Sequence, residues 1–183
     1  MVLFFHLKEK DGLIFMKNIA LVGFMGTGKT TVGKILARRM NYAFVDIDAL
    51  IEKEQGAAIT RIFSEFGEPY FRKLEADMIS RLSCQEGLVI SAGGGAVMDS
   101  RNVDNLKMCG SLVCLTASPE VILKRVGGST HRPLLKTPDP LGRVKELLAA
   151  RAPYYARADI TVDTDGLTAE EAAGRILDLV GEL

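Results

Sequence analysis

Tryptophan is absent from this 183-residue chain, cysteine is scarce, and no apolar run is long. The cysteines Cys84, Cys109 and Cys114 are odd in number and scattered, so their spacing fits neither a disulfide framework nor a paired zinc site. We expect free thiols in a reducing compartment, which predicts a cytoplasmic protein. A membrane-spanning helix would need an apolar run of about 18 residues, and the sequence contains none.

An excess of charge of one sign is missing as well. Lysine and arginine together number 23, and aspartate and glutamate also number 23, so the formal net charge is zero. A neutral chain has no overall field to attract nucleic acid or an acidic membrane, and we expect neither as a partner. The apolar content of 48% and the charged content of 25% are typical of a soluble globular protein.

The length predicts one domain with a sizeable core. Residues 1–15 begin with a short apolar stretch that charged side chains follow at once, and this stretch is too short for the core of a signal peptide. We expect the segment to be a disordered extension or an over-long gene start, with an added edge element as the alternative. Residues 16–183 are predicted to form the single domain.

One motif dominates what is present. Residues 23–30 read Gly-Phe-Met-Gly-Thr-Gly-Lys-Thr, a complete match to the phosphate-binding loop G-x-x-x-x-G-K-[ST]. An apolar run typical of a buried strand precedes the motif, and a segment with apolar residues at helical spacing follows it. A glycine-rich turn without a ligand is the alternative, and the strand–loop–helix context argues against it.

Each part of such a loop has a physical role. The glycines let the backbone curl until several N–H groups point inward, and the following helix adds the positive end of its dipole. Lys29 supplies an ammonium group for the outer phosphates, and the Thr30 hydroxyl is a ligand for Mg²⁺. The motif predicts binding of a nucleoside triphosphate with Mg²⁺, but it does not name the phosphoryl acceptor.

Strand-like and helix-like segments alternate along the chain. The alternation predicts a three-layer α/β/α fold with a parallel sheet, whose ligands bind beyond the carboxyl ends of the strands. The expected strands are residues 18–23, 43–46, 87–91, 111–116 and 160–163. The expected helices are residues 29–40, 48–55, 60–66, 69–84, 100–107, 119–126, 140–152 and 168–181.

Residues 127–140 are predicted to form a mobile lid. The segment starts with two glycines, ends with spaced prolines and carries cations such as Arg132 between them. A lid that closes over phosphates needs hinges and positive charge. A plain surface loop is the alternative.

Two carboxylates follow the second predicted strand. Asp46-Ile47-Asp48 ends that strand, and strand alternation would place both carboxylates on one side. Many phosphate-loop proteins complete the Mg²⁺ shell with an aspartate at a strand end. The third predicted strand has Ser91 where that acid is expected, so Asp46 is the best candidate. Asp48 is expected to orient or deprotonate an acceptor hydroxyl, with a helix cap as the alternative.

Glycines and arginines suggest the second substrate. Three glycines at residues 93–95 permit close ligand approach after the third strand, with a flexible connection as the alternative. Arg72 stands at a helix start, where a solvated side chain is common, but Glu75 is placed to aim it. Arginine matches the fork geometry of carboxylate and phosphate, so the arginines predict an anionic acceptor. The set is Arg72, Arg125, Arg132 and Arg151.

Several spaced motifs now coincide. After the phosphate loop come Asp-Ile-Asp at 46–48, Gly-Glu-Pro-Tyr-Phe-Arg at 67–72, Gly-Gly-Gly-Ala-Val at 93–97, Arg-Pro-Leu-Leu at 132–135 and Arg-Ala-Pro-Tyr-Tyr at 151–155. This order, over about residues 17–165, closely resembles shikimate kinase, an enzyme of aromatic amino-acid biosynthesis. The resemblance implies a nucleoside-monophosphate-kinase-like P-loop fold with a five-stranded parallel sheet in the order 2-3-1-4-5. It also implies transfer of the γ-phosphoryl group of ATP to the 3-hydroxyl of shikimate.

The resemblance further implies roles for single residues. The catalytic residues would be Lys29, Asp48 and Arg132. ATP would be held by Gly26, Thr27, Gly28, Lys29, Thr30, Thr31, Arg125 and Arg132, with Arg125 near adenine. Mg²⁺ would be bound by Thr30, and through water by Asp46 and Ser91. Shikimate would be bound by Asp48, Phe63, Phe71, Arg72, Gly93, Gly94, Gly95 and Arg151.

The chain departs from the family pattern near its end. Arg157 stands where many members have an acid, so residues 156–159 receive no role, and the adenine contact after Thr164 is unassigned. Two other functions compete: a kinase of the same fold acting on gluconate or a nucleotide, and a regulatory module that binds ATP without an acceptor. The G-E-x-x-F-R run argues against the first, and intact Lys29, Asp48 and Arg132 argue against the second. ATP and shikimate are the expected partners, and the chain is expected to be a monomer.

Overall fold

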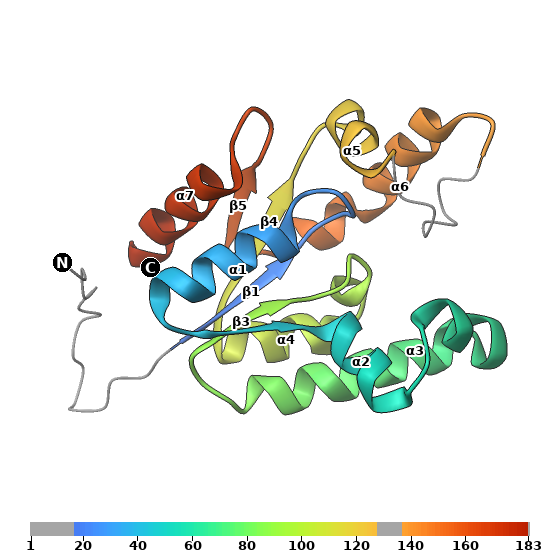
Figure 1. Ribbon diagram of the computed structural model, residues 1–183, viewed down its shortest axis with the longest axis horizontal. Helices are drawn as coiled ribbons and strands as arrows, with labels where there is room; N and C mark the ends of the chain where they lie inside the picture. Colours follow the sequence, from blue (N-terminus) through green and yellow to red (C-terminus); the bar gives the residue numbers. More distant parts are fainter. Residues whose placement is uncertain (1–16, 128–136, 183) are drawn as a thin grey trace.

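The computed structural model describes residues 17–127 and 137–182. Parallel strands form one five-stranded sheet in the order β2-β3-β1-β4-β5 (Figure 1). The strands are β1 (Asn18–Val22), β2 (Ala43–Asp46), β3 (Leu88–Ser91), β4 (Gly110–Thr116) and β5 (Ile160–Asp163). The predicted fold class and strand order are confirmed. The extension at 1–15 and most of the predicted lid lie outside the described residues.

Helices cover both faces of the sheet (Figure 1). Helices α1 (Lys29–Met40) and α7 (Ala169–Gly181) pack against each other on one face, and α3 (Ile59–Ser83) and α4 (Ser100–Met108) pack together on the other. The remaining helices are α2 (Ile47–Gln55), α5 (Pro119–Val126), α6 (Pro140–Tyr155) and the short 3₁₀ helix η1 (Ala96–Met98). The sheet therefore forms the middle of three layers.

The central strand β1 is buried throughout because both of its faces meet helices. Ile19 and Leu21 belong to the core under α1 and α7, whereas Ala20 and Val22 belong to the core under α3 and α4. This division follows from the strand period of two, which sends successive side chains to opposite faces. The phosphate loop therefore starts from the most enclosed strand of the molecule.

Helices α5 and α7 begin within one residue of the starts predicted at 119 and 168, and side chains cap both. The Ser118 hydroxyl accepts the Val121 N–H ahead of α5, and Thr168 and Glu171 form a reciprocal capping box at α7. The predicted helices at 60–66 and 69–84 correspond to the two parts of α3, which meet at a kink where Gly67 has the non-helical values φ 81° and ψ 169°. Residues other than glycine almost never adopt this backbone conformation.

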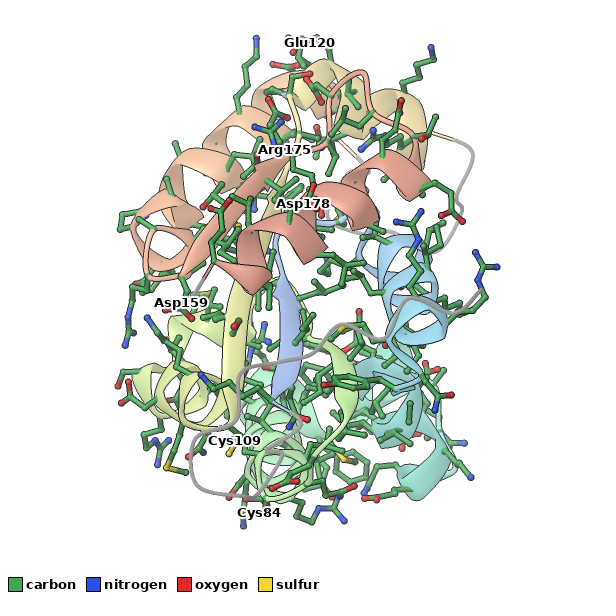
Figure 2. All side chains as sticks on the ribbon, turned by 90° about the vertical axis from the view of Figure 1, so that its left-hand side faces the viewer. Cys84, Cys109, Glu120, Asp159, Arg175 and Asp178 are labelled. Atoms are coloured by element: carbon green, nitrogen blue, oxygen red, sulfur yellow. The ribbon has the colours of Figure 1, made fainter. Side chains whose placement is uncertain are left out.

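The amino ends of the strands lie at the edge opposite the phosphate loop. Figure 2 looks onto this edge, where Cys84 precedes β3, Cys109 precedes β4 and Asp159 precedes β5. The three cysteines are free thiols, as predicted; Cys84 is exposed and Cys114 is buried. In the part of the chain that the structure describes, no helix combines the length and apolar character that a membrane crossing requires.

Candidate active site

The phosphate-binding loop connects β1 to α1 at the carboxyl edge of the sheet. Gly23, Gly26 and Gly28 have φ values of 133°, 78° and 98°, which favour glycine. At Gly23 the space is closed as well, because a Cβ there would stand 2.2 Å from the carbonyl oxygen of Leu115. The first N–H groups of α1 have no partner within the helix. Together with the helix dipole they provide a site for anions.

Lys29 and Thr27 brace this loop. The Lys29 ammonium donates to the carbonyl oxygens of Gly23 at 2.9 Å and Phe24 at 3.0 Å. The Thr27 hydroxyl, which is buried, donates to the Phe24 carbonyl oxygen at 2.8 Å. Thr31 is exposed on the first turn of α1. The predicted ATP-binding residues from Gly26 to Thr31 thus form one continuous turn of backbone.

The predicted metal-binding residues lie together where three strands end. The Thr30 hydroxyl is 3.2 Å from Asp46 Oδ2, and Ser91 is the register partner of Asp46 across β2 and β3. Hydroxyl and carboxylate oxygens suit Mg²⁺, which commonly takes one or two carboxylates together with substrate phosphates. Over residues 17–127 and 137–182, no group of three or more Asp, Glu, His or Cys side chains gathers for a metal. The set fits a cation that binds together with a phosphate ligand.

The structure corrects the expected geometry of Asp48. Strand β2 ends at Asp46, and Asp48 lies in the first turn of α2, so strand alternation does not place the two carboxylates. Asp46 is the residue that caps α2, accepting the N–H of Ala49 at 3.4 Å. The helix-cap alternative for Asp48 is therefore wrong, because the capping role belongs to Asp46.

Two carboxylates with buried oxygen atoms, Asp48 and Glu75, face the glycine segment after β3. A Cβ on Gly93 would stand 3.4 Å from Asp48 Oδ1 and 2.8 Å from Glu75 Oε1. Both oxygens are buried, and neither has a hydrogen-bond partner among the described residues. Burial raises the pKa of Asp48, and the neighbouring Asp46 raises it further, whereas Lys29 and Arg72 oppose the shift. Buried acceptors are normally satisfied, so this position suits the hydroxyl groups of a ligand.

Arg72 is held between two carboxylates of α3. Its Nη1 donates to Glu75 Oε2 at 2.7 Å, and its Nη2 donates to Glu68 Oε1 at 2.9 Å. The side chain of Arg72 is 33% exposed, whereas that of Glu75 is fully buried. Burial raises the pKa of Glu75 to about 6, with Arg72 opposing the shift. The predicted pairing of Glu75 with Arg72 is confirmed, and the Arg72 side chain is partly exposed and paired rather than fully solvated.

Aromatic rings line the same region. The Phe63 and Phe71 ring centroids are 4.9 Å apart, and the Arg72 guanidinium carbon lies 5.4 Å from the centroid of Phe71. On α6, the Arg151 guanidinium carbon lies 5.4 Å from the centroid of the Phe24 ring. The two rings predicted to wall a substrate therefore form one surface beside Arg72.

The three glycines at residues 93–95 lie where the phosphate loop, Arg72 and Arg151 come together. A Cβ on Gly95 would stand 2.5 Å from Arg72 Nη2. A Cβ on Gly94 would stand 3.0 Å from the Gly23 carbonyl oxygen and 3.3 Å from Arg151 Nη1. The segment therefore contacts the phosphate loop and both arginines at once. A Cβ at Gly94 would press on the backbone of the phosphate loop, whereas the close atoms at Gly93 and Gly95 are the ends of the Glu75 and Arg72 side chains. The role of this segment in ligand binding stays a prediction.

Sequence reasoning missed two side chains of this cluster. Glu68 makes the second ion pair of Arg72, and its signal was the spacing of four residues along a helix. The hydroxyl of Tyr155 donates to the Gly94 carbonyl oxygen at 2.9 Å. Tyr155 stands four residues after Arg151 on α6, which was its signal in the sequence.

The other predicted residues lie apart from this cluster. Arg125 donates to the Gly26 carbonyl oxygen at 3.3 Å and to the Thr164 hydroxyl at 2.8 Å, so it ties the phosphate loop to the segment after β5. Its contact with adenine stays a prediction. Arg157 lies 3.6 Å from Asp104 on α4. Arg132 lies outside the described residues.

Comparisons of the whole chain with known proteins point to one family. The model of the family described as shikimate kinase matches residues 25–180. A protein of Thermodesulfovibrio yellowstonii named shikimate kinase is 49% identical over 162 residues, which are 88% of this chain and 94% of that protein. The chain belongs to the shikimate kinase family.

Further comparisons agree with this assignment. The shikimate kinase of Caldanaerobacter subterraneus is 45% identical over 88% of this chain and 95% of that protein. A solved structure, shikimate kinase from Acinetobacter baumannii in complex with shikimate, superposes with a TM-score of 0.85 at 38% identity, covering 90% of this chain and 93% of that one. The predicted shikimate kinase resemblance and ATP-dependent kinase class are confirmed. The gluconate or nucleotide kinase and the regulatory module are set aside.

Proposed function

We propose that this protein transfers the γ-phosphoryl group of ATP to the 3-hydroxyl of shikimate, giving ADP and 3-phosphoshikimate on the route to chorismate. One observation supports this most strongly. Gly94 packs against the phosphate loop at Gly23 and against Arg151, while Gly93 adjoins the unpartnered oxygen of Asp48. The proposed site for a small hydroxylated acid therefore adjoins the proposed phosphate site, and Gly94 lies between them.

ATP is proposed to bind along the phosphate loop. The backbone of Gly26–Thr31 would hold the phosphates, with the Lys29 ammonium at their outer end. When bound with ATP, Mg²⁺ supplies positive charge that neutralises the phosphate oxygens. Thr30 would hold the ion directly, and Asp46 and Ser91 would hold it through water. The contact between Thr30 and Asp46 supports this arrangement.

The acceptor is proposed to bind against the three glycines. Arg72 and Arg151 would bind its carboxylate, because guanidinium groups pair with carboxylates at fork geometry. Phe63 and Phe71 would cover one face of the ring, and the N–H groups of Gly93, Gly94 and Gly95 would complete the contacts. The buried oxygen of Asp48 would accept the hydrogen of the reacting hydroxyl.

Phosphoryl transfer depends on alignment and charge neutralisation more than on covalent chemistry. Asp48 is proposed to orient the 3-hydroxyl and to take its proton, and the raised pKa of Asp48 favours that role at neutral pH. The Lys29 ammonium would stabilise the negative charge that develops on the transferred phosphoryl group. Arg132 would add a second cation from the lid at 127–140, a role worth about 10³–10⁵ in rate in phosphoryl-transfer enzymes.

The organisation predicted from the sequence completes the proposal. Residues 16–183 would form the single kinase domain, preceded by an extension at 1–15. The protein is proposed to act as a monomer in the cytoplasm. Gel filtration coupled to light scattering tests the monomer, and a mass near twice the 19.9 kDa of one chain would contradict it.

ADP release measured with shikimate and with 3-deoxyshikimate tests the reaction. We expect rapid release only with shikimate, because the deoxy acid lacks the acceptor oxygen. Asp48→Asn should lower kcat by about 10²-fold or more while leaving ATP affinity near the wild-type value. Asp77→Asn, a matched change at an exposed position of α3, should leave kcat unchanged. Equal release with both acids would contradict the proposed reaction.

A further inference from the structure

Tyr155 lies at the inner end of α6 and is only 7% exposed. Its hydroxyl donates to the carbonyl oxygen of Gly94 at 2.9 Å. Because Arg151 precedes it by four residues on the same helix, the two side chains extend from adjacent turns of one face. A single side chain of α6 is thus bonded to the glycine segment that carries the proposed acceptor site.

Tyr155 and Arg151 meet at the same glycine. The position of a Cβ on Gly94 is 3.2 Å from the Tyr155 hydroxyl oxygen and 3.3 Å from Arg151 Nη1. A phenol has one hydrogen to donate, and here the Gly94 carbonyl oxygen accepts it, so only lone pairs remain for a neighbour. A guanidinium offers only donors. The lone pairs of the phenol oxygen can therefore accept a hydrogen bond from the neighbouring Arg151 guanidinium.

The pKa of the Tyr155 phenol agrees with a hydroxyl that donates to Gly94 and accepts from Arg151. Burial raises the pKa of the Tyr155 phenol, while the Arg151 guanidinium opposes the shift. The phenol therefore stays protonated at neutral pH, as its bond to Gly94 requires. On the other side of Gly94, the Gly23 carbonyl oxygen accepts the Lys29 ammonium at 2.9 Å. Gly94 is thus fixed between the tyrosine and the phosphate loop.

We propose that Tyr155 is a positioning residue, which sets Arg151 and the glycine segment at 93–95 in the geometry that an acceptor carboxylate needs. The inference rests on the proposed role of Arg151 as a carboxylate ligand. Without the hydroxyl, Arg151 keeps its contact with Phe24 but loses its lateral acceptor, and the Gly94 carbonyl oxygen loses its donor. The contribution of the ligand's carboxylate to binding should therefore fall, whereas the contribution of the rest of the ligand should not change.

Tyr155→Phe tests this by removing one oxygen atom, and Tyr154→Phe makes the same change at the neighbouring, partly buried residue. Calorimetry measures binding of shikimate and of its neutral analogue, in which the carboxylate is reduced to a hydroxymethyl group. We expect Tyr155→Phe to weaken shikimate binding about tenfold, with the analogue unchanged. Tyr154→Phe should alter neither. In turnover, the KM for shikimate should rise while kcat and the KM for ATP stay near wild type.

Every other outcome contradicts either the inference about Tyr155 or the proposed carboxylate role of Arg151. An equal loss for both ligands in Tyr155→Phe, or no loss for either, overturns the positioning role. Comparison of two ligands within one variant cancels any general loss of folded protein. The Arg151→Ala variant tests the carboxylate role of Arg151 separately from the positioning role of Tyr155. If Arg151→Ala keeps the wild-type preference for the acid, the carboxylate role of Arg151 itself fails. If Arg151→Ala loses that preference and Tyr155→Phe keeps it, only the inference about Tyr155 fails.

Discussion

Arg72 is fixed before any acid reaches it. Glu68 and Glu75 hold its guanidinium from two sides, and the Phe71 ring lies under it. A long side chain that is already ordered loses less conformational entropy when a ligand binds. The fully buried Glu75 would therefore act on the proposed acceptor site through Arg72.

At the scale of this residue, Arg72→Ala should raise the KM for shikimate with little effect on the KM for ATP. Loss of a charged hydrogen-bond partner costs about 1.5–3 kcal/mol, which corresponds to a rise of roughly tenfold or more. Steady-state kinetics with each substrate varied in turn measures both constants. Arg61→Ala is the matched control, since Arg61 pairs with Glu65 on the exposed side of α3. An unchanged KM for shikimate would contradict the assignment of Arg72.

Glu75 gives a prediction about pH. Its pKa in the folded protein is raised from the ordinary 4.5 to about 6, so between these values the folded state holds a proton that the unfolded state has released. Stability therefore falls as pH rises through this window, by about 2 kcal/mol at 1.36 kcal/mol per unit. Glu75→Gln removes the titrating group. The unfolding free energy of this variant, relative to wild type, should increase by most of that amount from pH 4.5 to pH 7.

Urea denaturation at both pH values measures this difference. Only the change with pH enters the comparison, so a constant offset from the altered ion pair with Arg72 cancels. Glu65→Gln, on the exposed face of α3, should follow the wild-type pH dependence. A parallel dependence in Glu75→Gln would show that Glu75 titrates as an exposed carboxyl does.

At the scale of the element, α3 depends on its bend at Gly67. The residue has φ 81° and ψ 169°, a region that costs other residues of order 1–3 kcal/mol. The nearest atom to a Cβ there is Pro69 Cδ at 3.6 Å, so no clash adds to the strain. Gly67→Ala should lower the unfolding free energy by about that amount, measured by urea denaturation.

Gly174 provides the opposite case in α7. A Cβ there would meet only Arg39 Nη1 at 3.5 Å, and alanine in a helix interior is about 0.5–1 kcal/mol more stable than glycine. Gly174→Ala should therefore stabilise the protein, although the chemical change is identical. If Gly67→Ala and Gly174→Ala changed the unfolding free energy in the same direction, backbone conformation would not explain the two effects.

The sequence predicted the elements well where a local signal exists. The predicted helix at 168–181 and the interruption between the helices at 60–66 and 69–84 both correspond to local features, the capping box at Thr168 and the kink at Gly67. The geometry of Asp48 was predicted wrongly because a strand and a helix can follow each other without a loop. Alternation was extended past Asp46, where α2 already begins. The predicted strand ended at residue 46 and the predicted helix began at residue 48, so the error lay in applying strand alternation across a boundary that the sequence had indicated.

At the scale of the whole molecule, the site combines local and distant contacts. The phosphate loop was predictable because its residues are consecutive. The contact of Tyr155 with Gly94 joins positions 61 residues apart, and no pattern in a single sequence encodes such a contact. The arginines and the glycine segment were singled out from residue type and position, and the family resemblance gave them roles. The contact of Tyr155 with Gly94 emerged only from packing.

Binding at the phosphate loop should stabilise the whole fold. A non-hydrolysable ATP analogue with Mg²⁺ at 100 times its Kd should add about 2.7 kcal/mol to the unfolding free energy. Thermal denaturation with and without the analogue measures this gain. Lys29→Met should abolish most of it. Lys34→Met, on the same helix but beside Phe44, should retain it, and equal gains in both variants would contradict the role of Lys29.

Cys84 has a practical consequence. Its thiol is exposed at the amino edge of the sheet (Figure 2), whereas the proposed site lies at the carboxyl edge, and Cys114 is enclosed in β4. A maleimide-coated bead or sensor chip would therefore anchor the enzyme by its far end. Molecules immobilised through Cys84 would all present their reactive side to the flowing solution.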